Sequence, residues 1–214
     1  PITSSRPLLD IVGTGGDGMG TFNISSLAAV TAAACGAAVA KHGNRAVSSV
    51  SGSADFFAGM GVPIDLSPAG AEQLLEETGF SFLFAPIYHS AMKYAAPARR
   101  ELGVKTIMNL LGPLVNPACA EYQVIGVFSR DFLRPVAEAI QMLGVKRAMV
   151  VHASDGLDEI TVTGPTDAYL VEENGSIDHM SIDPGSMGIS AYKVNDLIGG
   201  SSEDNSAFAL ELIE

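Results

Sequence analysis

Residues 8–26 read Leu-Leu-Asp-Ile-Val-Gly-Thr-Gly-Gly-Asp-Gly-Met-Gly-Thr-Phe-Asn-Ile-Ser-Ser, and this stretch decides the fold class. Residues 8–12 are a short apolar run typical of a buried strand. Residues 25–35 predict a helix with serine at its cap and Gly36 placed to end it. The loop between them holds five glycines, at positions 13, 15, 16, 18 and 20. Such a loop, ending at a helix N-terminus, can direct backbone N–H groups at an anion, so it predicts a phosphate cradle.

The alternation of strands and helices continues along the chain. Further strands are predicted at residues 37–40, 80–85, 122–128 and 148–152, and further helices at 68–78, 90–102, 132–143 and 202–214. This rhythm predicts an α/β fold with a mostly parallel central sheet flanked by helices. Asn174-Gly175 lies between two late strands, at 168–172 and 176–182, and predicts an antiparallel hairpin with a type I′ turn at one edge of the sheet. We expect residues 1–214 to form a single domain.

Composition narrows the function classes. The 214 residues are 47% hydrophobic, which excludes a disordered chain, and Asp+Glu 24 against Lys+Arg 12 gives a net charge of −12. An acidic surface disfavours binding to nucleic acid or to an anionic membrane. No secretory leader is evident, and Cys35 and Cys119 lie far apart, as expected for reduced thiols in a cytoplasmic protein. Eleven of the 12 cationic residues precede residue 148, which suggests where an anion would bind.

The glycine loop alone does not define its ligand. Gly13, Gly15 and Gly18 fit the dinucleotide pattern GxGxxG, but Lys41 stands where that pattern requires an acid. The P-loop pattern also fails, because no Gly-Lys-Ser/Thr follows. A purely structural glycine turn is the alternative to a phosphate cradle.

A second polar cluster begins at Lys41-His-Gly-Asn-Arg45 and runs on through several serines to Asp55. Lysine, arginine and hydroxyl groups suit a multiply phosphorylated ligand, although a solvated polar loop has the same composition. The cluster follows a predicted strand, as the glycine loop does. Both should therefore open at the carboxyl edge of the sheet, where such folds bind ligands.

A third cluster consists of the adjacent carboxylates Asp158 and Glu159, after the predicted strand that ends at His152. Mg²⁺ takes one or two protein carboxylates and fills its shell with water and phosphate oxygens, so this pair could hold it. An acidic pair on the surface is the alternative. Arg99 and Arg100 offer a clamp for a carboxylate or phosphate, or two solvated charges, and spacing does not choose between them.

Five linked motifs together resemble those of anthranilate phosphoribosyltransferases, from about Leu9 to Gly164. They are Asp10-Ile-Val-Gly-Thr-Gly-Gly-Asp17 with Asn23-Ile-Ser25, Lys41-His-Gly-Asn-Arg45, Ser51-Gly-Ser-Ala-Asp55, Thr106-Ile-Met-Asn-Leu-Leu-Gly-Pro-Leu-Val-Asn-Pro117 and Gly156-Leu-Asp-Glu159. The resemblance implies transfer of a phosphoribosyl group from phosphoribosyl diphosphate to the amine of anthranilate, in tryptophan biosynthesis. It also implies a nucleoside phosphorylase/phosphoribosyltransferase-like fold and Mg²⁺ as cofactor.

The resemblance also implies roles for individual residues. Those implied to hold phosphoribosyl diphosphate are Gly13, Gly16, Asp17, Thr21, Asn23, Ser25, Ser26, Lys41 and Ser53. Anthranilate would meet Gly13, Asn44 and Arg99, with Arg99 placed for its carboxylate. Mg²⁺ would be held, directly or through water, by Ser25, Asp158 and Glu159. Lys41, backbone donors and the Mg²⁺ held by Asp158 and Glu159 would stabilise the leaving diphosphate, and no strong general base is nominated.

The resemblance also implies a homodimer and a small helical domain at the N-terminus, and we expect this chain to lack that helical domain. The chain also ends before the helices that usually finish the α/β domain in this family, so we expect the α/β domain to be incomplete. Two other functions fit a glycine-rich phosphate loop on this fold: a pyrimidine-nucleoside phosphorylase and a non-catalytic ligand-binding relative. The anthranilate-side motifs argue against the phosphorylase, and Lys41, Asn44, Arg99, Asp158 and Glu159 argue against the non-catalytic relative.

Overall fold

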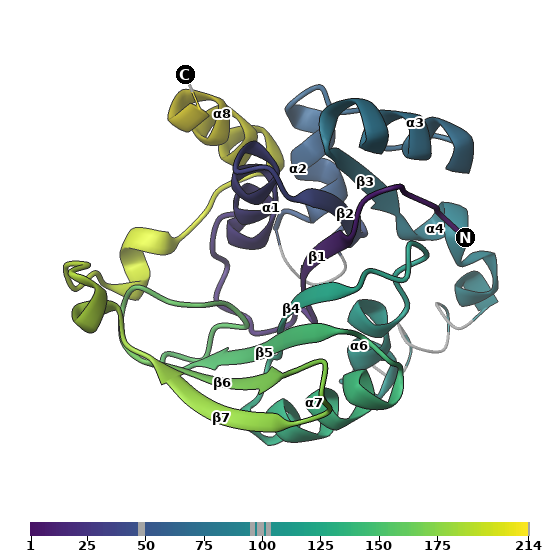
Figure 1. The fold of residues 1–214 in the computed structure, drawn as a ribbon. Coiled ribbons are helices and arrows are strands. Elements are labelled where there is room, and N and C mark those ends of the chain that lie inside the picture. The colour runs from purple at the N-terminus through teal and green to yellow at the C-terminus, as the bar shows by residue number, and fades with distance from the viewer. Residues whose placement is uncertain (47–49, 95–96, 98–100, 102–103, 214) are drawn as a thin grey trace.

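The computed structural model describes residues 1–46, 50–94, 97, 101 and 104–213. Its centre is a seven-stranded sheet of order β3-β2-β1-β4-β5-β6-β7 (Figure 1). The strands are β1 (Leu8–Gly13), β2 (Ala38–Gly43), β3 (Phe80–Phe84), β4 (Tyr122–Gly126), β5 (Arg147–Ala153), β6 (Thr166–Val171) and β7 (Ile177–Ile182). The first five pair in parallel, whereas β6 and β7 pair antiparallel at one edge. The predicted fold class and the late hairpin are therefore confirmed.

Helices connect the strands and continue beyond the hairpin. They are α1 (Ile24–Ala34), α2 (Ser53–Gly59), α3 (Pro68–Thr78), α4 (Ala85–Tyr88), α6 (Met108–Leu111), α7 (Leu133–Met142) and α8 (Ser202–Ile213). Short 3₁₀ turns are η1 (Ser90–Tyr94), η2 (Gly112–Leu114), η3 (Arg130–Phe132), η4 (Pro184–Met187) and η5 (Val194–Leu197). Within the described residues, no helix has the length and apolar character needed to cross a bilayer.

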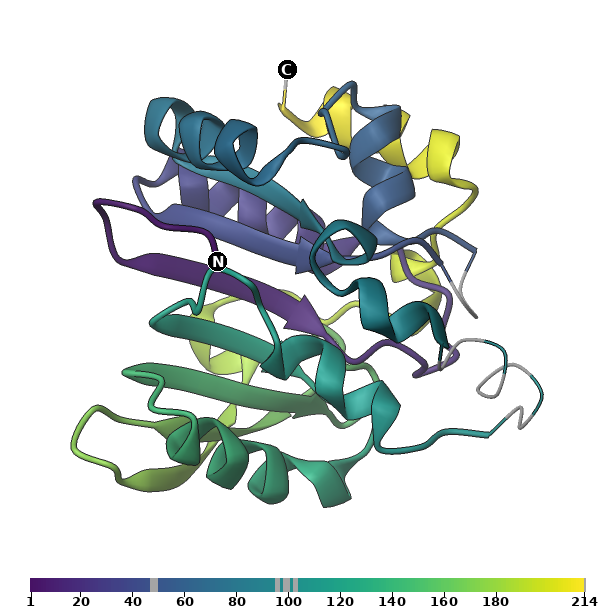
Figure 2. The same cartoon turned by 90° about the vertical axis from the view of Figure 1, so that its right-hand side faces the viewer.

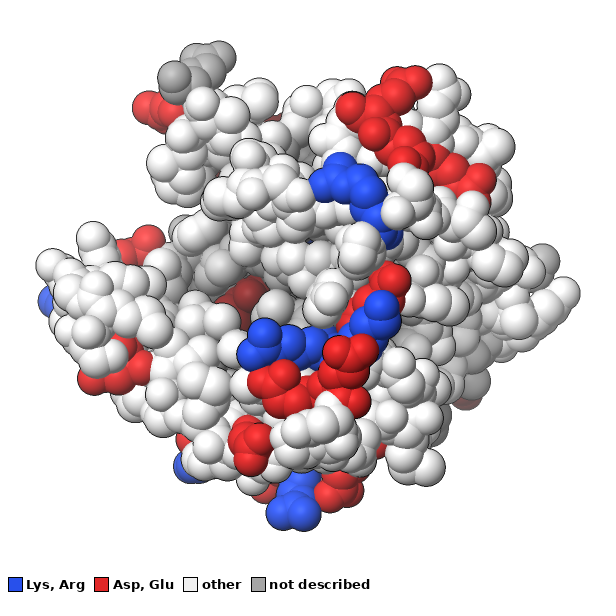
Figure 3. All heavy atoms as spheres, in the orientation of Figure 1, with Lys and Arg blue, Asp and Glu red and all other residues white. Residues whose placement is uncertain are grey.

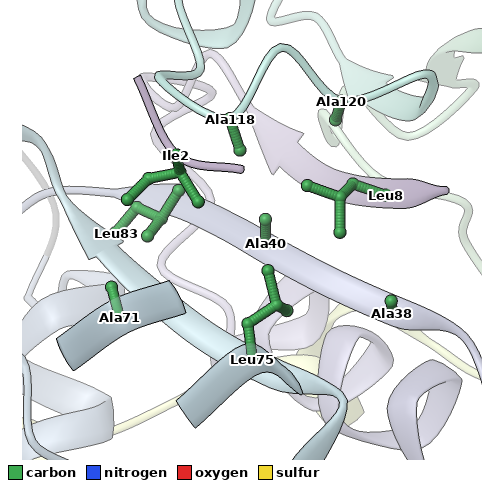
Figure 4. Packing of buried hydrophobic residues seen from close by; sticks show 9 residues of the cluster. All are labelled: Ile2, Leu8, Ala38, Ala40, Ala71, Leu75, Leu83, Ala118 and Ala120. Carbon is green, nitrogen blue, oxygen red and sulfur yellow. The ribbon is translucent and has the colours of Figure 1, made fainter. Parts of the chain in front are cut away.

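Helices cover both faces of the sheet. On one face, Leu75 of α3 packs with Leu8, Ala40 and Leu83 of the first three strands (Figure 4). Helix α7 covers the β4–β5 part of that face. On the other face, α1, α2 and α8 enclose a second cluster built around Phe56, Phe57 and Phe82. Side chains alternate between the faces along each strand, which places Lys41 on the face covered by α1.

Capping residues in the sequence predict some helix ends correctly and others incorrectly. Helix α3 has the predicted bounds because the Ser67 side chain accepts from the Gly70 N–H at 3.2 Å and Gly79 adopts a φ of 78°. The serine cap predicted for α1 is wrong: the helix begins at Ile24, with Asn23 as N-cap. Of the helix predicted at 90–102, residues 90–94 form the η1 turn, and most of the rest lies outside the described residues.

The type I′ turn predicted at Asn174-Gly175 is also wrong. Glu172 N donates to Ser176 O and Gly175 N donates to Glu172 O, which encloses a three-residue loop. Type I′ needs a positive φ at both central residues, but among the described non-glycine residues only Cys119 has one. Gly175, with a φ of 82°, supplies the single left-handed residue that a three-residue hairpin needs.

The order of the strands creates a switch point between β1 and β4. From β1 the chain moves outward to β2 and β3, and from β4 it moves the other way to β5. Figure 2 shows the parallel strands pointing the same way, with the loops after β1 and β2 gathered at their carboxyl ends. Crevices at such switch points bind ligands in open α/β sheets, so the ends of β1 and β4 mark the candidate site.

Candidate functional site

The glycine-rich loop leaves β1 at the switch point. Gly15, Gly16, Gly18 and Gly20 have φ values between 63° and 80°, a region that glycine adopts without strain. The loop is tied to its neighbours at its start, where Thr14 N donates to Gly126 O at 2.9 Å. It is therefore a shaped turn whose far end leads into the N-terminus of α1.

The segment that carries Asp158 lies across the ends of β1 and β4. Asp158 is buried, and its Oδ2 accepts from Gly15 N at 2.7 Å. A Cβ on Gly13 would lie 2.6 Å from that same oxygen, and a Cβ on Gly126 would overlap the Asp158 backbone carbonyl. Glycine is thus required at the ends of both strands so that this acidic segment can lie against them.

Replacing Gly126 with alanine is expected to displace this segment, because the added methyl group would overlap backbone rather than a flexible side chain. We expect the free energy of unfolding to fall by about 3 kcal/mol, measured by urea denaturation. Gly112→Ala is the matched control: Gly112 has a helical φ of −50°, and no described atom lies within 4 Å of its added Cβ. Equal stability of the two variants would contradict this role of Gly126.

Lys41 lies beneath the loop rather than on the surface. Its side chain is 1% exposed, and its Nζ donates to Ile11 O and, at 3.3 Å, to Ser25 Oγ. Burial lowers the pKa of Lys41 from its usual value, and the charges of Asp10, Glu159 and Asp158 oppose this shift only in part. These carboxylates, and any bound anion, favour the protonated form of the buried amine, so Lys41 is placed to supply a positive charge at the base of the candidate site.

The carboxyl groups at the site repel one another. Burial and the nearby charge of Asp17 raise the pKa of Asp158 to about 6. Burial and the charge of Asp158 raise the pKa of Glu159 to about 8, although Lys41 and the Ser25 N–H, which donates to Glu159 Oε1 at 3.2 Å, oppose this shift. Carboxylates held this close together would be stabilised by a bound cation.

The carboxylates at the site fit Mg²⁺ if water and phosphate oxygens supply its remaining ligands. Among residues 1–46, 50–94, 97, 101 and 104–213, no group of three or more His, Cys, Asp or Glu side chains could enclose a metal ion. Mg²⁺ does not need such a cage, because it commonly takes one or two carboxylates and completes its shell with water and phosphate oxygens. Asp158 and Glu159 are adjacent in sequence, and the charge of Asp158 acts on Glu159, so this pair can supply those carboxylates.

Most of the other predicted ligand residues lie on the same side of the sheet. Asp17 accepts from Met19 N at 3.2 Å within the glycine loop, and Thr21 and Asn23 follow it toward α1. Ser26, in the first turn of α1, is 1% exposed, and its hydroxyl has no hydrogen-bond partner among the described residues. Ser53 begins α2 and donates to Asn44 O at 3.3 Å.

The residues expected on the anthranilate side are only partly described. Asn44 is exposed just after β2, and its Oδ1 accepts from Arg45 N at 2.8 Å. Arg45 itself pairs with Asp55. Arg99 and Arg100 lie outside the described residues.

Three residues beside the site were not predicted from sequence. Asp10 is fully buried next to Lys41, and burial raises its pKa to about 6. Asn116 donates to Asp10 Oδ2 at 2.7 Å and to Ala40 O at 2.8 Å, which ties the 106–117 motif to β1 and β2. The Lys105 Cε lies 3.5 Å from the Cβ position of Gly16, and its Nζ lies 4.1 Å from the centroid of the Phe128 ring. Lys105 therefore adds a cation at the glycine loop.

The charge of the surface as a whole differs from that of the site. Figure 3 shows acidic side chains gathered over α3, which carries Glu72, Glu76 and Glu77, and elsewhere on this face Lys and Arg atoms lie among Asp and Glu. No continuous basic patch is visible on the face shown. The cations Lys41 and Lys105 are instead placed at the glycine loop, as a local anion site on an acidic protein requires.

A strand, a glycine loop and a helix meet at the switch point of this α/β domain, beside a buried lysine and paired carboxylates, an arrangement whose chemistry suits a phosphorylated ligand. Residues 5–213 match the family model described as "Glycosyl transferase family, a/b domain". The chain belongs to this family.

The individual proteins that this chain resembles carry the name of one enzyme. The anthranilate phosphoribosyltransferase of Moorella thermoacetica is 50% identical over 210 residues, which are 98% of this chain and 62% of that protein. The crystal structure of the Thermus thermophilus enzyme of the same name superposes with a TM-score of 0.90 at 49% identity, over 100% of this chain and 63% of that one. The Saccharomyces cerevisiae enzyme, solved in complex with phosphoribosyl diphosphate and Mg, gives a TM-score of 0.90 at 29% identity over 99% of this chain and 58% of that one. The chain thus spans less than two thirds of the length of these relatives.

Proposed function

We propose that this chain carries the phosphoribosyl diphosphate site of a cytoplasmic anthranilate phosphoribosyltransferase of tryptophan biosynthesis. The observation that carries the proposal is the convergence, at the switch point between β1 and β4, of the glycine loop, buried Lys41 and the pair Asp158 and Glu159. The homologous enzymes and the yeast complex with phosphoribosyl diphosphate and Mg support it. Single-domain organisation and the homodimer implied by the family stay predictions.

In this proposal the glycine loop receives the diphosphate. Backbone N–H groups of the loop, the N-terminus of α1 and the side chains of Thr21, Asn23 and Ser25 donate to phosphate and ribose oxygens. Ser26 and Ser53 are also among the residues predicted to hold phosphoribosyl diphosphate. Gly13 and Gly16 let the ligand approach the backbone closely, because neither carries a side chain.

The reaction breaks the bond between the ribose anomeric carbon and the diphosphate oxygen and forms a bond from that carbon to the anthranilate nitrogen. The amine then loses a proton to water. Negative charge accumulates on the leaving diphosphate, and the buried charge of Lys41 and the loop N–H groups stabilise it. Bound Mg²⁺, held by Asp158 and Glu159 with Ser25, would neutralise part of that charge. Asn44 and Arg99 would hold anthranilate in line with the anomeric carbon, so catalysis rests on positioning and electrostatics.

The test is a turnover assay with the chain, Mg²⁺, phosphoribosyl diphosphate and anthranilate, followed by the loss of anthranilate fluorescence. Loss of fluorescence with an equal release of diphosphate supports the transferase. Phosphorolysis of uridine or thymidine in place of this reaction would favour a pyrimidine-nucleoside phosphorylase. Binding of phosphoribosyl diphosphate without turnover would favour a ligand-binding role.

Arg99→Ala tests the acceptor side. Loss of a charge-assisted hydrogen bond to the anthranilate carboxylate is expected to raise the KM for anthranilate by about 10- to 100-fold, with little change in the KM for phosphoribosyl diphosphate. Arg100→Ala, which removes the same charge at the next residue, is the control and should leave both values near those of the parent chain. Equal losses for both substrates in Arg99→Ala would refute the assignment of Arg99.

A further inference from the structure

The C-terminal segment returns to the glycine loop after the hairpin. Phe22 N donates to Leu197 O at 3.0 Å, Gly199 N donates to Gly20 O at 2.9 Å, and Thr21 and Ile198 form an antiparallel bridge. Helix α8 begins three residues later and packs with α2. A part of the chain with no predicted site residue thus lies directly against the end of the loop.

Asn205 of α8 makes the most specific of these contacts. The residue is 4% exposed. Its Nδ2 donates to Asn23 Oδ1 at 3.0 Å, and its own Oδ1 accepts from Gly200 N at 2.8 Å. Ser51 Oγ also donates to Asn23 Oδ1, at 3.0 Å. The Asn23 oxygen therefore receives two donors from segments that are 28 and 182 residues away.

Asn23 is the N-cap of α1, yet its side chain makes no capping hydrogen bond. Asparagine at this position usually accepts from an N–H of the first helical turn. Here the oxygen faces Asn205 and Ser51 instead, and the amino group donates to Ser51 O at 3.4 Å. An amide nitrogen carries two hydrogens, so this orientation keeps a second N–H for a ligand.

We propose that Asn205 is a positioning residue that fixes the amide of Asn23 with its oxygen away from the ligand and its N–H toward a phosphate or ribose oxygen of phosphoribosyl diphosphate. The inference rests on the proposed function for the identity of the ligand. The orientation itself rests on the hydrogen bonds of Asn23, Ser51 and Asn205. A reversed amide would present its oxygen to an anion, which repels it.

Two variants of Asn205 separate positioning from simple support. Asn205→Asp keeps the shape and the acceptor for Gly200 N but replaces the donor to Asn23 with an acceptor, which favours the reversed amide. Asn205→Ala removes the donor without favouring reversal, because Ser51 still donates to Asn23. Positioning predicts about 30-fold weaker phosphoribosyl diphosphate binding for Asn205→Asp and about 3-fold for Asn205→Ala. If Asn205 only supported the fold, Asn205→Ala should weaken binding more than Asn205→Asp, because aspartate has the same shape as asparagine.

The measurement is calorimetric titration of the 214-residue chain with phosphoribosyl diphosphate in Mg²⁺, repeated in an Asn23→Ala background. In that background the difference between the two Asn205 variants should vanish, whereas simple repulsion by the new charge would persist. Ser206→Ala is the matched control, because Ser206 Oγ donates to Phe56 O at 2.9 Å and joins α8 to α2 without touching Asn23. It should keep parental affinity.

The orientation of the Asn23 side-chain amide can also be measured by NMR in the absence of ligand. In ¹⁵N-labelled chain, the Asn23 side-chain hydrogens should show nuclear Overhauser contacts to residue 205 in Asn205→Asp but not in Asn205→Ala. Equal affinities of these two variants, or a difference that survives in Asn23→Ala, would overturn the inference. If the parent chain binds no phosphoribosyl diphosphate, the proposed function fails, and the amide contacts alone then decide whether Asn205 orients Asn23.

Discussion

Lys41→Met is expected to lower the free energy of unfolding by about 3–5 kcal/mol and to abolish phosphoribosyl diphosphate binding at neutral pH. The reason is that Lys41 is the buried amine facing Asp10, Asp158 and Glu159, and it is the group placed to compensate their charge. Removing one partner of a buried charge group leaves the others uncompensated, which costs more than the pair itself contributes. Loss of the Nζ contact would also free Ser25 Oγ at the start of α1.

Chemical denaturation and calorimetric titration measure the two effects of Lys41→Met separately. Lys146→Met is the matched control, because Lys146 is exposed before β5 and should change neither quantity by more than about 0.5 kcal/mol. Should Lys41→Met prove too unstable to titrate, Lys41→Arg keeps the charge but not the fit and should still bind the ligand poorly. Parental affinity in a folded Lys41→Met protein would contradict the role of Lys41.

Asp158→Asn combined with Glu159→Gln is expected to cut turnover at fixed Mg²⁺ by at least about 100-fold while leaving the chain folded. Both amides keep an oxygen to accept from Gly15 N and Ser25 N, so the backbone contacts of the segment survive. The negative charge that would hold Mg²⁺ is lost. Asp131→Asn combined with Glu173→Gln removes two exposed charges and should leave turnover unchanged.

The same pair of changes should alter how stability depends on pH. In the parent chain the pKa of Asp158 is raised to about 6 and that of Glu159 to about 8, so the folded state binds more protons than the unfolded state above about pH 4. Their contribution is therefore most favourable below the unfolded pKa values and declines as pH rises toward 8. Without metal or ligand, the double variant should lose less stability between pH 5 and pH 8 than the parent chain does. Near-normal turnover, or an unchanged pH profile, would refute this account of the two carboxylates.

Sequence was most informative where the signal was local. Helix α3 followed from Ser67 and Gly79, which act within one turn of the residues they cap. Helices α2 and α6 were not predicted, because each is short. The buried face of α2 is defined only by distant partners, since Phe56 and Phe57 pack with Ala209 of α8. The Asn174-Gly175 signal correctly placed the hairpin, but it cannot distinguish a two-residue loop from a three-residue one.

In the candidate site, too, the residues with a local sequence signal were predicted and the others were not. The glycine loop, Lys41 and the acidic pair were all found from residue types following predicted strands. The roles of Asp10, Asn116 and Asn205 depend on partners 31 to 182 residues away, and no local pattern identifies those partners. Lys105 was missed because its place at the glycine loop depends on the path of the chain before α6.

Calorimetric titration of the chain with phosphoribosyl diphosphate, with and without Mg²⁺, tests the central claim most directly. The glycine loop, Lys41, Asp158 and Glu159 all belong to the described residues, so the titration tests the proposed site directly on this chain. The account predicts saturable binding of one ligand per chain in Mg²⁺, and much weaker binding when the metal is removed with a chelator. No binding, or equal affinity with and without Mg²⁺, would contradict it.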